Sequence, residues 1–129
     1  MTRKVRILRR IPVIASLLVT IQGCSDSGIL DEWVSLCTEM GARSDGPSQS
    51  ECGCVADELA GMLDSKYLVM MEEEAKFKSG DPRKVLEIHE EQAVRDKAGI
   101  GDGLFDWAKA KAVITSAAQD AARKCGAVY

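Results

Sequence analysis

The chemistry of this chain is concentrated in its cysteines, above all in the pair Cys52-Gly53-Cys54. The pair lies early in a long stretch, residues 48–78, whose apolar spacing predicts one helix. A thiol near a helix N-terminus is activated, and a disulfide between residues two apart is strained and therefore oxidising. A thiol–disulfide redox protein that uses Cys52 and Cys54 is therefore one functional hypothesis, although the acidic residues around the pair disfavour a thiolate.

Two further cysteines offer structural partners to this pair. Side chains two residues apart on a helix point about 200° from each other, so Cys52 and Cys54 are poorly placed to bond to each other. Two connectivities remain open: Cys37–Cys52 with Cys54–Cys125, or Cys37–Cys54 with Cys52–Cys125. Either one ties the first and last helices to the middle helix, and each bond typically contributes about 2–4 kcal/mol. We therefore expect structural disulfides at Cys37, Cys52, Cys54 and Cys125.

No other residue pattern supports catalysis or ligand binding. His89 is the only histidine, and the sequence from His89 to Ala93 lacks the second histidine of a zinc-binding helix. The loop Gly101-Asp102-Gly103 has neither the acidic ladder of a calcium loop nor the lysine of a phosphate loop. A zinc site of four cysteines is disfavoured by Cys-x-Cys spacing and by an oxidising compartment. We expect no catalytic residue, no metal, no cofactor and no small-molecule substrate.

The first 24 residues have the layout of a secretory signal. Residues 1–10 are basic, residues 11–21 are apolar, and Gln22-Gly23-Cys24 follows directly. The apolar run is about 16 Å long as a helix, roughly half of a bilayer core, so a retained transmembrane helix is not expected. We predict that residues 1–23 are removed and that residues 24–129 form a single domain.

The cleavage site resembles the lipobox of bacterial lipoproteins, with Ile21 at −3, Gly23 at −1 and Cys24 at +1; Gln22 at −2 departs from the usual small or aliphatic residue. This resemblance covers only the leader. It implies that the Cys24 thiol carries a diacylglycerol, and that its amino group carries a third acyl chain in many Gram-negative species. Two or three chains anchor a protein stably. Ser25 at +2 implies the outer membrane rather than the inner one, with the domain facing the periplasm.

The number of cysteines agrees with a lipid on Cys24. Five thiols in an oxidising compartment leave one without a partner, whereas giving Cys24 to the lipid leaves an even set of four. The alternative is an ordinary secreted protein in which Cys24 only lies near the cleavage point.

The charge of the mature chain excludes some partners. The formal net charge is −3 for the whole chain, but the leader carries five basic residues and no acid. The remaining chain keeps 12 Lys and Arg against 20 Asp and Glu, a net charge of −8. Such a domain has no basic stripe for nucleic acid and is repelled by anionic lipid headgroups unless it is tethered.

Composition and apolar periodicity predict an all-α domain, an antiparallel bundle of about four helices. The first helix is expected over residues 29–40, capped by Ser27 and ended by Gly41, and the second over residues 48–78. The third helix should begin with Asp81 as N-cap and Pro82 at N1 and end near residues 97–99. The fourth is expected over residues 104–125, ended by Gly126. Each of the last three helices is expected to have an apolar inner face. In the second helix this face consists of Val55, Leu59, Met62, Leu63, Tyr67 and Met70, and in the third of Val85, Leu86, Ile88, Ala93 and Val94. In the fourth it consists of Phe105, Trp107, Ala110, Ile114, Ala117, Ala118, Ala121 and Cys125.

These features lead to one main functional hypothesis. The chain is expected to be a non-enzymatic, lipid-anchored protein of the bacterial cell envelope that presents an acidic helical surface to a protein partner near the membrane. An accessory of a larger envelope assembly, an immunity or exclusion factor and a holdase all fit this description.

Overall fold

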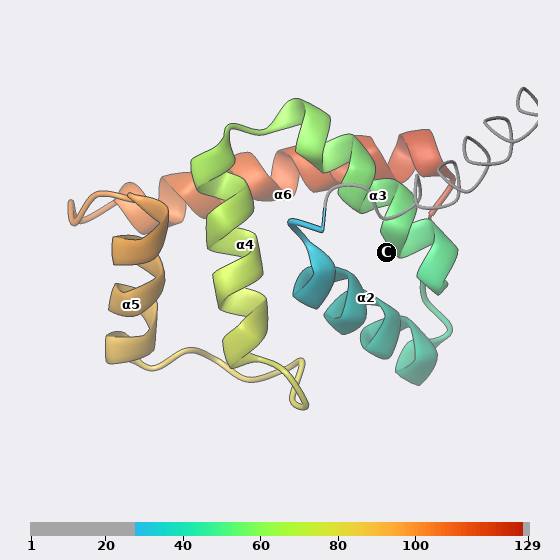
Figure 1. Ribbon diagram of the computed structural model, residues 1–129, viewed down its shortest axis with the longest axis horizontal. Helices are drawn as coiled ribbons and strands as arrows, with labels where there is room; N and C mark the ends of the chain where they lie inside the picture. Colours follow the sequence, from blue (N-terminus) through green and yellow to red (C-terminus); the bar gives the residue numbers. More distant parts are fainter. Residues whose placement is uncertain (1–27, 128–129) are drawn as a thin grey trace, which may run out of the picture.

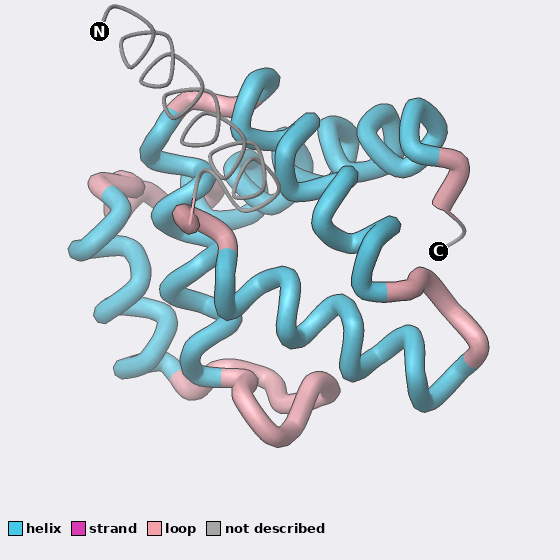
Figure 2. The backbone as a smooth tube through the Cα atoms, turned by 45° about the vertical axis from the view of Figure 1, so that its right-hand side comes forward, coloured by secondary structure: helices cyan, strands magenta, loops and turns pink. Residues whose placement is uncertain are grey.

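The computed structural model describes residues 28–127, and all five elements in that range are helices: α2 (Asp31–Ser44), α3 (Gln49–Met62), α4 (Ser65–Phe77), α5 (Ile88–Ala98) and α6 (Asp106–Cys125). The prediction of an all-α fold is confirmed, but the described residues hold one helix more than expected. Loops connect the helices directly (Figure 2). The predicted leader, Cys24, Ser25 and the proposed cap Ser27 lie outside the described residues.

The first predicted helix continues one turn further than expected. Gly41 lies inside α2, which ends at Ser44, and the following residue, Asp45, adopts a left-handed φ of 57°. A Cβ atom on Gly41 would lie 2.0 Å from the carbonyl oxygen of Pro47. Gly41 is thus needed for the close approach of the α2–α3 loop, and it does not terminate the helix.

The single helix predicted over residues 48–78 is wrong, because the chain breaks into α3 and α4. The break consists of Leu63 and Asp64, both in extended conformation. The predicted capping box at its start is present: Ser48 Oγ accepts from the Glu51 amide at 3.2 Å, and the Ser48 amide donates to Glu51 at 2.8 Å.

The break changes which side chains face inward. Val55 and Leu59 are buried as predicted, but a straight helix would carry that face on to Met62, which is exposed. In α4, Met70 is buried as predicted, and Leu68, Met71 and Ala75 are buried as well. Asp64 occupies the N-cap position of α4 but makes no side-chain capping hydrogen bond, so a local cap does not explain the break.

The third predicted helix starts too early. Residues 81–84 form a turn in which the Lys84 amide donates to the Asp81 carbonyl at 3.0 Å, and α5 begins only at Ile88. Its cap is a box between Glu87 and Glu90. Val85 lies in the non-helical chain before α5 and Ile88 is the first residue of that helix, and these two predicted inward residues are 84% and 89% exposed. The predicted end is confirmed, since Gly99 closes α5 with a φ of 76°.

The last helix starts two residues later than predicted and ends at Gly126 as expected. Asp106 lies in its first turn and accepts a hydrogen bond from the Gly103 amide at 2.8 Å. Because Leu104 and Phe105 precede the helix, they are 85% and 65% exposed, and the prediction that Phe105 points inward is wrong. Ala110, Ala121 and Ala122 are the buried residues of α6.

The helices form two apolar clusters that α6 joins. In Figure 1, α4 and α5 lie side by side at one end of α6, whereas α2 and α3 lie toward its other end. The stapled cluster consists of Leu30, Val55, Ala56, Leu59, Leu68, Met71, Ala121 and Ala122. The α5 cluster consists of Met70, Val94, Ala98, Ile100 and Ala110. No helix within residues 28–127 is long and apolar enough to cross a membrane.

Candidate functional site

The Cys52-Gly53-Cys54 pair is divided between two disulfides. Cys52 is bonded to Cys37 on α2 with a Cα–Cα distance of 6.0 Å, and Cys54 is bonded to Cys125 on α6 with a Cα–Cα distance of 5.9 Å. This is one of the two expected connectivities. Because the two side chains leave α3 in different directions, each reaches a different neighbouring helix.

The two disulfides differ in their surroundings. Cys52 is fully buried and Cys37 is 6% exposed, so the first bond belongs to the interior. Cys54 is exposed and Cys125 is half-buried. The second bond is therefore the one that a soluble reductant reaches.

The other residues considered for chemistry lie apart from the cysteines, around α5. His89 is exposed, and its Nδ1 atom lies 3.4 Å from a Glu87 carboxylate oxygen. Asp102 accepts a hydrogen bond from the Gln92 side-chain amide at 3.0 Å. Among residues 28–127 no three or more His, Cys, Asp or Glu side chains are grouped so that they could hold a metal ion.

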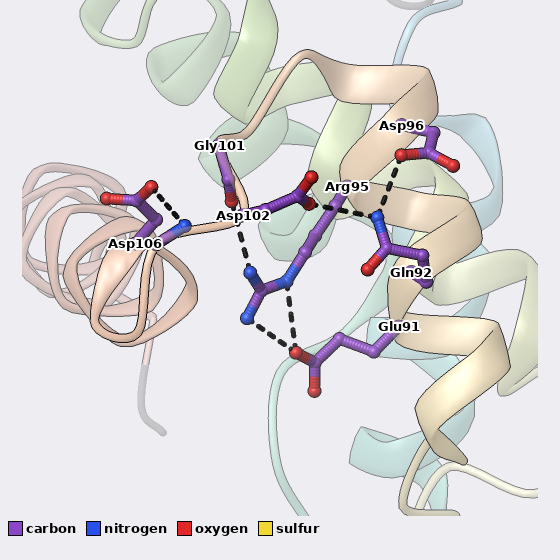
Figure 3. A network of polar contacts seen from close by, with 8 residues as sticks. Glu91, Gln92, Arg95, Asp96, Gly101, Asp102 and Asp106 are labelled. Carbon is purple, nitrogen blue, oxygen red and sulfur yellow. Dashed lines mark hydrogen bonds and ion pairs between the residues drawn. The ribbon is translucent and has the colours of Figure 1, made fainter.

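Asp102 belongs to a polar network that joins α5 to the loop before α6 (Figure 3). Arg95 is at its centre and donates to Glu91 at 2.8 Å and to the Gly101 carbonyl at 3.1 Å. The Arg95 guanidinium also lies 5.6 Å from the centre of the Trp107 ring, within the range of a cation–π contact. Through these contacts Gly101 and Asp102 fix the turn between α5 and α6, so we assign both residues a structural role.

A carboxylate fixes the start of α2 across a long sequence distance. Glu72 on α4 accepts hydrogen bonds from the amides of Glu32 (2.9 and 3.1 Å) and Trp33 (3.1 Å). These amides lack partners within the helix, and an anion there also interacts well with the helix dipole. Sequence reasoning missed this role, because no local pattern shows which helix end a glutamate will reach.

A second charge network stabilises the start of α5. Glu90 accepts from the Glu87 amide at 2.9 Å and from Lys84 Nζ at 2.8 Å. The hydrogen bond from the Glu87 amide is the main cause that lowers the pKa of Glu90, and Lys84 lowers it further.

A groove of about 930 Å³, here called the α2–α3 groove, lies between the first half of α2 and the first half of α3. This volume falls within the range of roughly 300–1,000 Å³ that is typical of binding pockets. The lining residues come from two separate segments: Gly28, Leu30, Asp31, Val34, Ser35, Ser48, Gln49, Ser50, Gly53, Cys54, Ala56 and Asp57.

The groove has an apolar base and a polar rim. Leu30 and Ala56 are buried, whereas the serines and both aspartates are exposed. The Cys37–Cys52 bond ties together the two helices that form it. Sequence reasoning missed the groove, because its two walls meet only after the α2–α3 turn has formed.

No family model, curated protein or solved structure matches this chain.

Proposed function

We propose that this protein is a lipid-anchored component of a bacterial cell envelope that acts by binding another protein and not by catalysis. The observation that carries the anchor is the pairing of the cysteines. Cys37, Cys52, Cys54 and Cys125 are used in two disulfides, so Cys24 is the odd thiol of an otherwise complete set. It follows the lipobox-like sequence at the position where a lipoprotein cysteine is acylated.

The protein-binding part of the proposal is supported by the surface of the domain. The mature chain has a formal net charge of −8, and Gly28, four residues after Cys24 in the sequence, is among the residues that line the α2–α3 groove. A covalently tied groove loses little conformational freedom on binding, which favours affinity.

The thiol–disulfide alternative is weakened by the same pairing. A redox centre at Cys52-Gly53-Cys54 requires that the two thiols exchange with each other. Here each sulfur is bonded to a different helix, and the Cys37–Cys52 bond is buried. We therefore assign both bonds a structural role.

Mass spectrometry of the mature protein, extracted from membranes without reduction, tests the proposal. We expect an N-terminal Cys24 that carries a diacylglyceryl thioether, together with peptides that link Cys37 to Cys52 and Cys54 to Cys125. Cys24→Ser should keep the leader and lose the lipid, whereas Ser25→Asp should keep the lipid and move the protein toward the inner membrane. An unmodified Cys24 would contradict the anchor, and a Cys52–Cys54 bond would favour the redox function.

A further inference from the structure

We infer that the outward face of α6 is a self-association surface, on which α6 of a second copy of this chain packs in the antiparallel direction. The inference goes beyond the proposed function, and only the step that concerns concentration rests on the lipid anchor. Three observations support it: the uncharged side chains exposed on this face, the sign of the charges on α6, and the register in which the face matches itself.

The first half of this face is almost free of charge. Between residues 105 and 116, Lys109 is the only exposed charged residue. Phe105 is 65% exposed, and its carbonyl accepts from the Lys109 amide at 2.9 Å, so Phe105 already follows the repeat of the helix. The outer face of a helix that meets only water usually carries charged side chains. Here the other exposed residues are uncharged: Phe105, Ala108, Ala112, Val113, Thr115 and Ser116.

The charges of α6 have the opposite balance to those of the rest of the domain. Among the five described helices, α6 alone has more basic than acidic residues, whereas α2, α3, α4 and α5 each have more acidic ones. The mature chain has a formal net charge of −8, so two copies repel each other over most of their surfaces. The face of α6 is therefore the helical surface on which two copies approach with the least repulsion.

The face matches itself when two copies of α6 run antiparallel. Its central stripe follows steps of three or four residues through positions 105, 109, 112, 116, 120 and 123, so it runs straight along the helix. In a two-fold pair, each contact between two different residues occurs twice. If Lys109 lies opposite Asp120 of the second copy, Ala112 lies within one residue of Ser116, next to the two-fold axis. Phe105 then lies within one residue of Arg123 of the second copy.

The charged contacts are compatible with the ion pair that α6 already contains. Asp120 bonds to Arg123 of its own chain, and both side chains are exposed. A carboxylate has two oxygens and can bind two cations, as Glu74 does with two lysines in this domain. Lys109 has no ion-pair partner among residues 28–127, so it is available to Asp120 of the second copy. The Arg123 guanidinium can at the same time stack on the Phe105 ring of that copy.

The proposed anchor raises the concentration at which this contact forms. A contact between two single helices is smaller than a typical stable interface, so we expect a weak dimer. Lipids on both chains hold the two copies in one plane and raise their effective concentration. A two-fold axis normal to the membrane directs both anchors to the same bilayer.

Photocrosslinking of the full chain in cells tests the inference. A photoreactive residue replaces Ala112, at the centre of the face, or Ala93, an exposed alanine on α5. We expect a covalent dimer from position 112, linked to residues 112–117 of the second copy, and none from position 93. Equal dimer yields from both positions would overturn the inference. Crosslinks from position 112 to lipid or to another protein alone would identify a different occupant and also overturn it.

A carbodiimide tests the register without a change of sequence. It joins a lysine ammonium to a carboxylate in contact with it, forms an amide and takes up the water that is lost. Lys109 and Asp120 of one chain are about 16 Å apart along α6, too far for such a bond. A linked peptide that contains both residues therefore reports contact between two copies. Absence of this peptide would overturn the antiparallel packing.

Exchanging the two charges separates a specific contact from the general charge. Lys109→Glu and Asp120→Lys should each lower the dimer yield from position 112 about fivefold, because each places like charges opposite each other. The two changes combined should restore the yield. Lys97→Glu alters the net charge as Lys109→Glu does, at an exposed lysine of α5, and should have no effect. An equal loss with Lys97→Glu, or no recovery in the combined variant, would overturn the inference.

The aromatic end of the face has its own matched pair of variants. Phe105→Ala should lower the dimer yield about threefold, since it removes the ring on which Arg123 of the second copy stacks. Val85→Ala truncates a side chain that is 84% exposed before α5 and should leave the yield unchanged. An equal effect of the two variants would argue that Phe105 is outside the contact and would overturn the register.

Cell fractionation separates failure of the dimer from failure of the proposed function. The dimer from position 112 in a soluble fraction, with an unmodified Cys24, would overturn the anchor and keep the self-association surface. Protein in the membrane fraction that carries lipid on Cys24 but gives no dimer by either method would keep the anchor and overturn the inference.

Discussion

The two apolar clusters of this domain are held together in different ways. Around the stapled cluster, two disulfides join α3 to α2 and to the end of α6. The α5 cluster has no cysteine, and α5 is held by packing on α4 and by the contacts of Arg95 with Gly101 and Trp107.

The difference shows where the domain can present a rigid surface. Disulfides restrict the unfolded chain, so their effect does not depend on a large core, which a chain of this size lacks. Polar contacts at the surface contribute less and leave α5 dependent on a few buried side chains. The α2–α3 groove lies on the stapled side, where both of its walls are covalently connected.

The largest effect is expected from removing the long-range disulfide. Cys54→Ser with Cys125→Ser opens a loop of sequence separation 71, for which chain entropy predicts a loss of about 4 kcal/mol in the free energy of unfolding. Urea denaturation followed by circular dichroism measures this loss. A loss below about 1 kcal/mol would show that packing alone holds the stapled side, and the contrast between the two clusters would disappear.

The next effect concerns the core of the α5 cluster. Met70 is fully buried on α4, and Met70→Ala should cost about 3 kcal/mol through lost burial and a cavity. Hydrogen exchange should show that amides of α5 lose more protection than those of α3. Leu59→Ala, in the stapled cluster, is the matched control and should affect α3 more strongly. Uniform loss of protection in both variants would mean that the domain unfolds as one unit.

A smaller effect is expected at the contact between α2 and α4. Glu72→Gln keeps an acceptor for the Glu32 and Trp33 amides but removes its charge, so we expect a loss of about 1 kcal/mol. Thermal unfolding measures it. Glu73→Gln is the control, because Glu73 pairs with Lys76 at the surface of the same helix. An equal loss in both variants would argue against a special role for the Glu72 carboxylate.

The smallest effect is a pH dependence at the start of α5. Because the pKa of Glu90 is lowered in the folded state, its stabilising contribution is complete above the pKa of an unfolded glutamate, about 4.3, and is lost as the pH falls through the lower folded value. The wild type should therefore exceed Glu90→Gln in urea stability at pH 6 and lose that advantage near pH 3. Glu39→Gln, at an exposed pair with Arg43, is the control. A constant difference at both pH values would contradict the assignment.

Much of the local structure could be predicted from the sequence. The Ser48–Glu51 capping box and the helix ends at Gly99 and Gly126 depend on residues a few positions apart, so their signals are complete in a short window. The exposed Val85 and Phe105 show the limit of the same reasoning. The apolar spacing predicted helix through the segments that precede α5 and α6, but the backbone hydrogen bonds of those segments form turns.

The sequence by itself determined that the domain is helical and acidic, and that four cysteines tie its helices together. The choice between Cys37–Cys52 and Cys37–Cys54, the break at Leu63 and Asp64, and the pairing of Glu72 with the start of α2 were decided only in the tertiary structure. The α2–α3 groove belongs to the same group. Each depends on which surfaces meet after the helices pack, and residues 15 to 71 positions apart leave no periodic signal of that meeting.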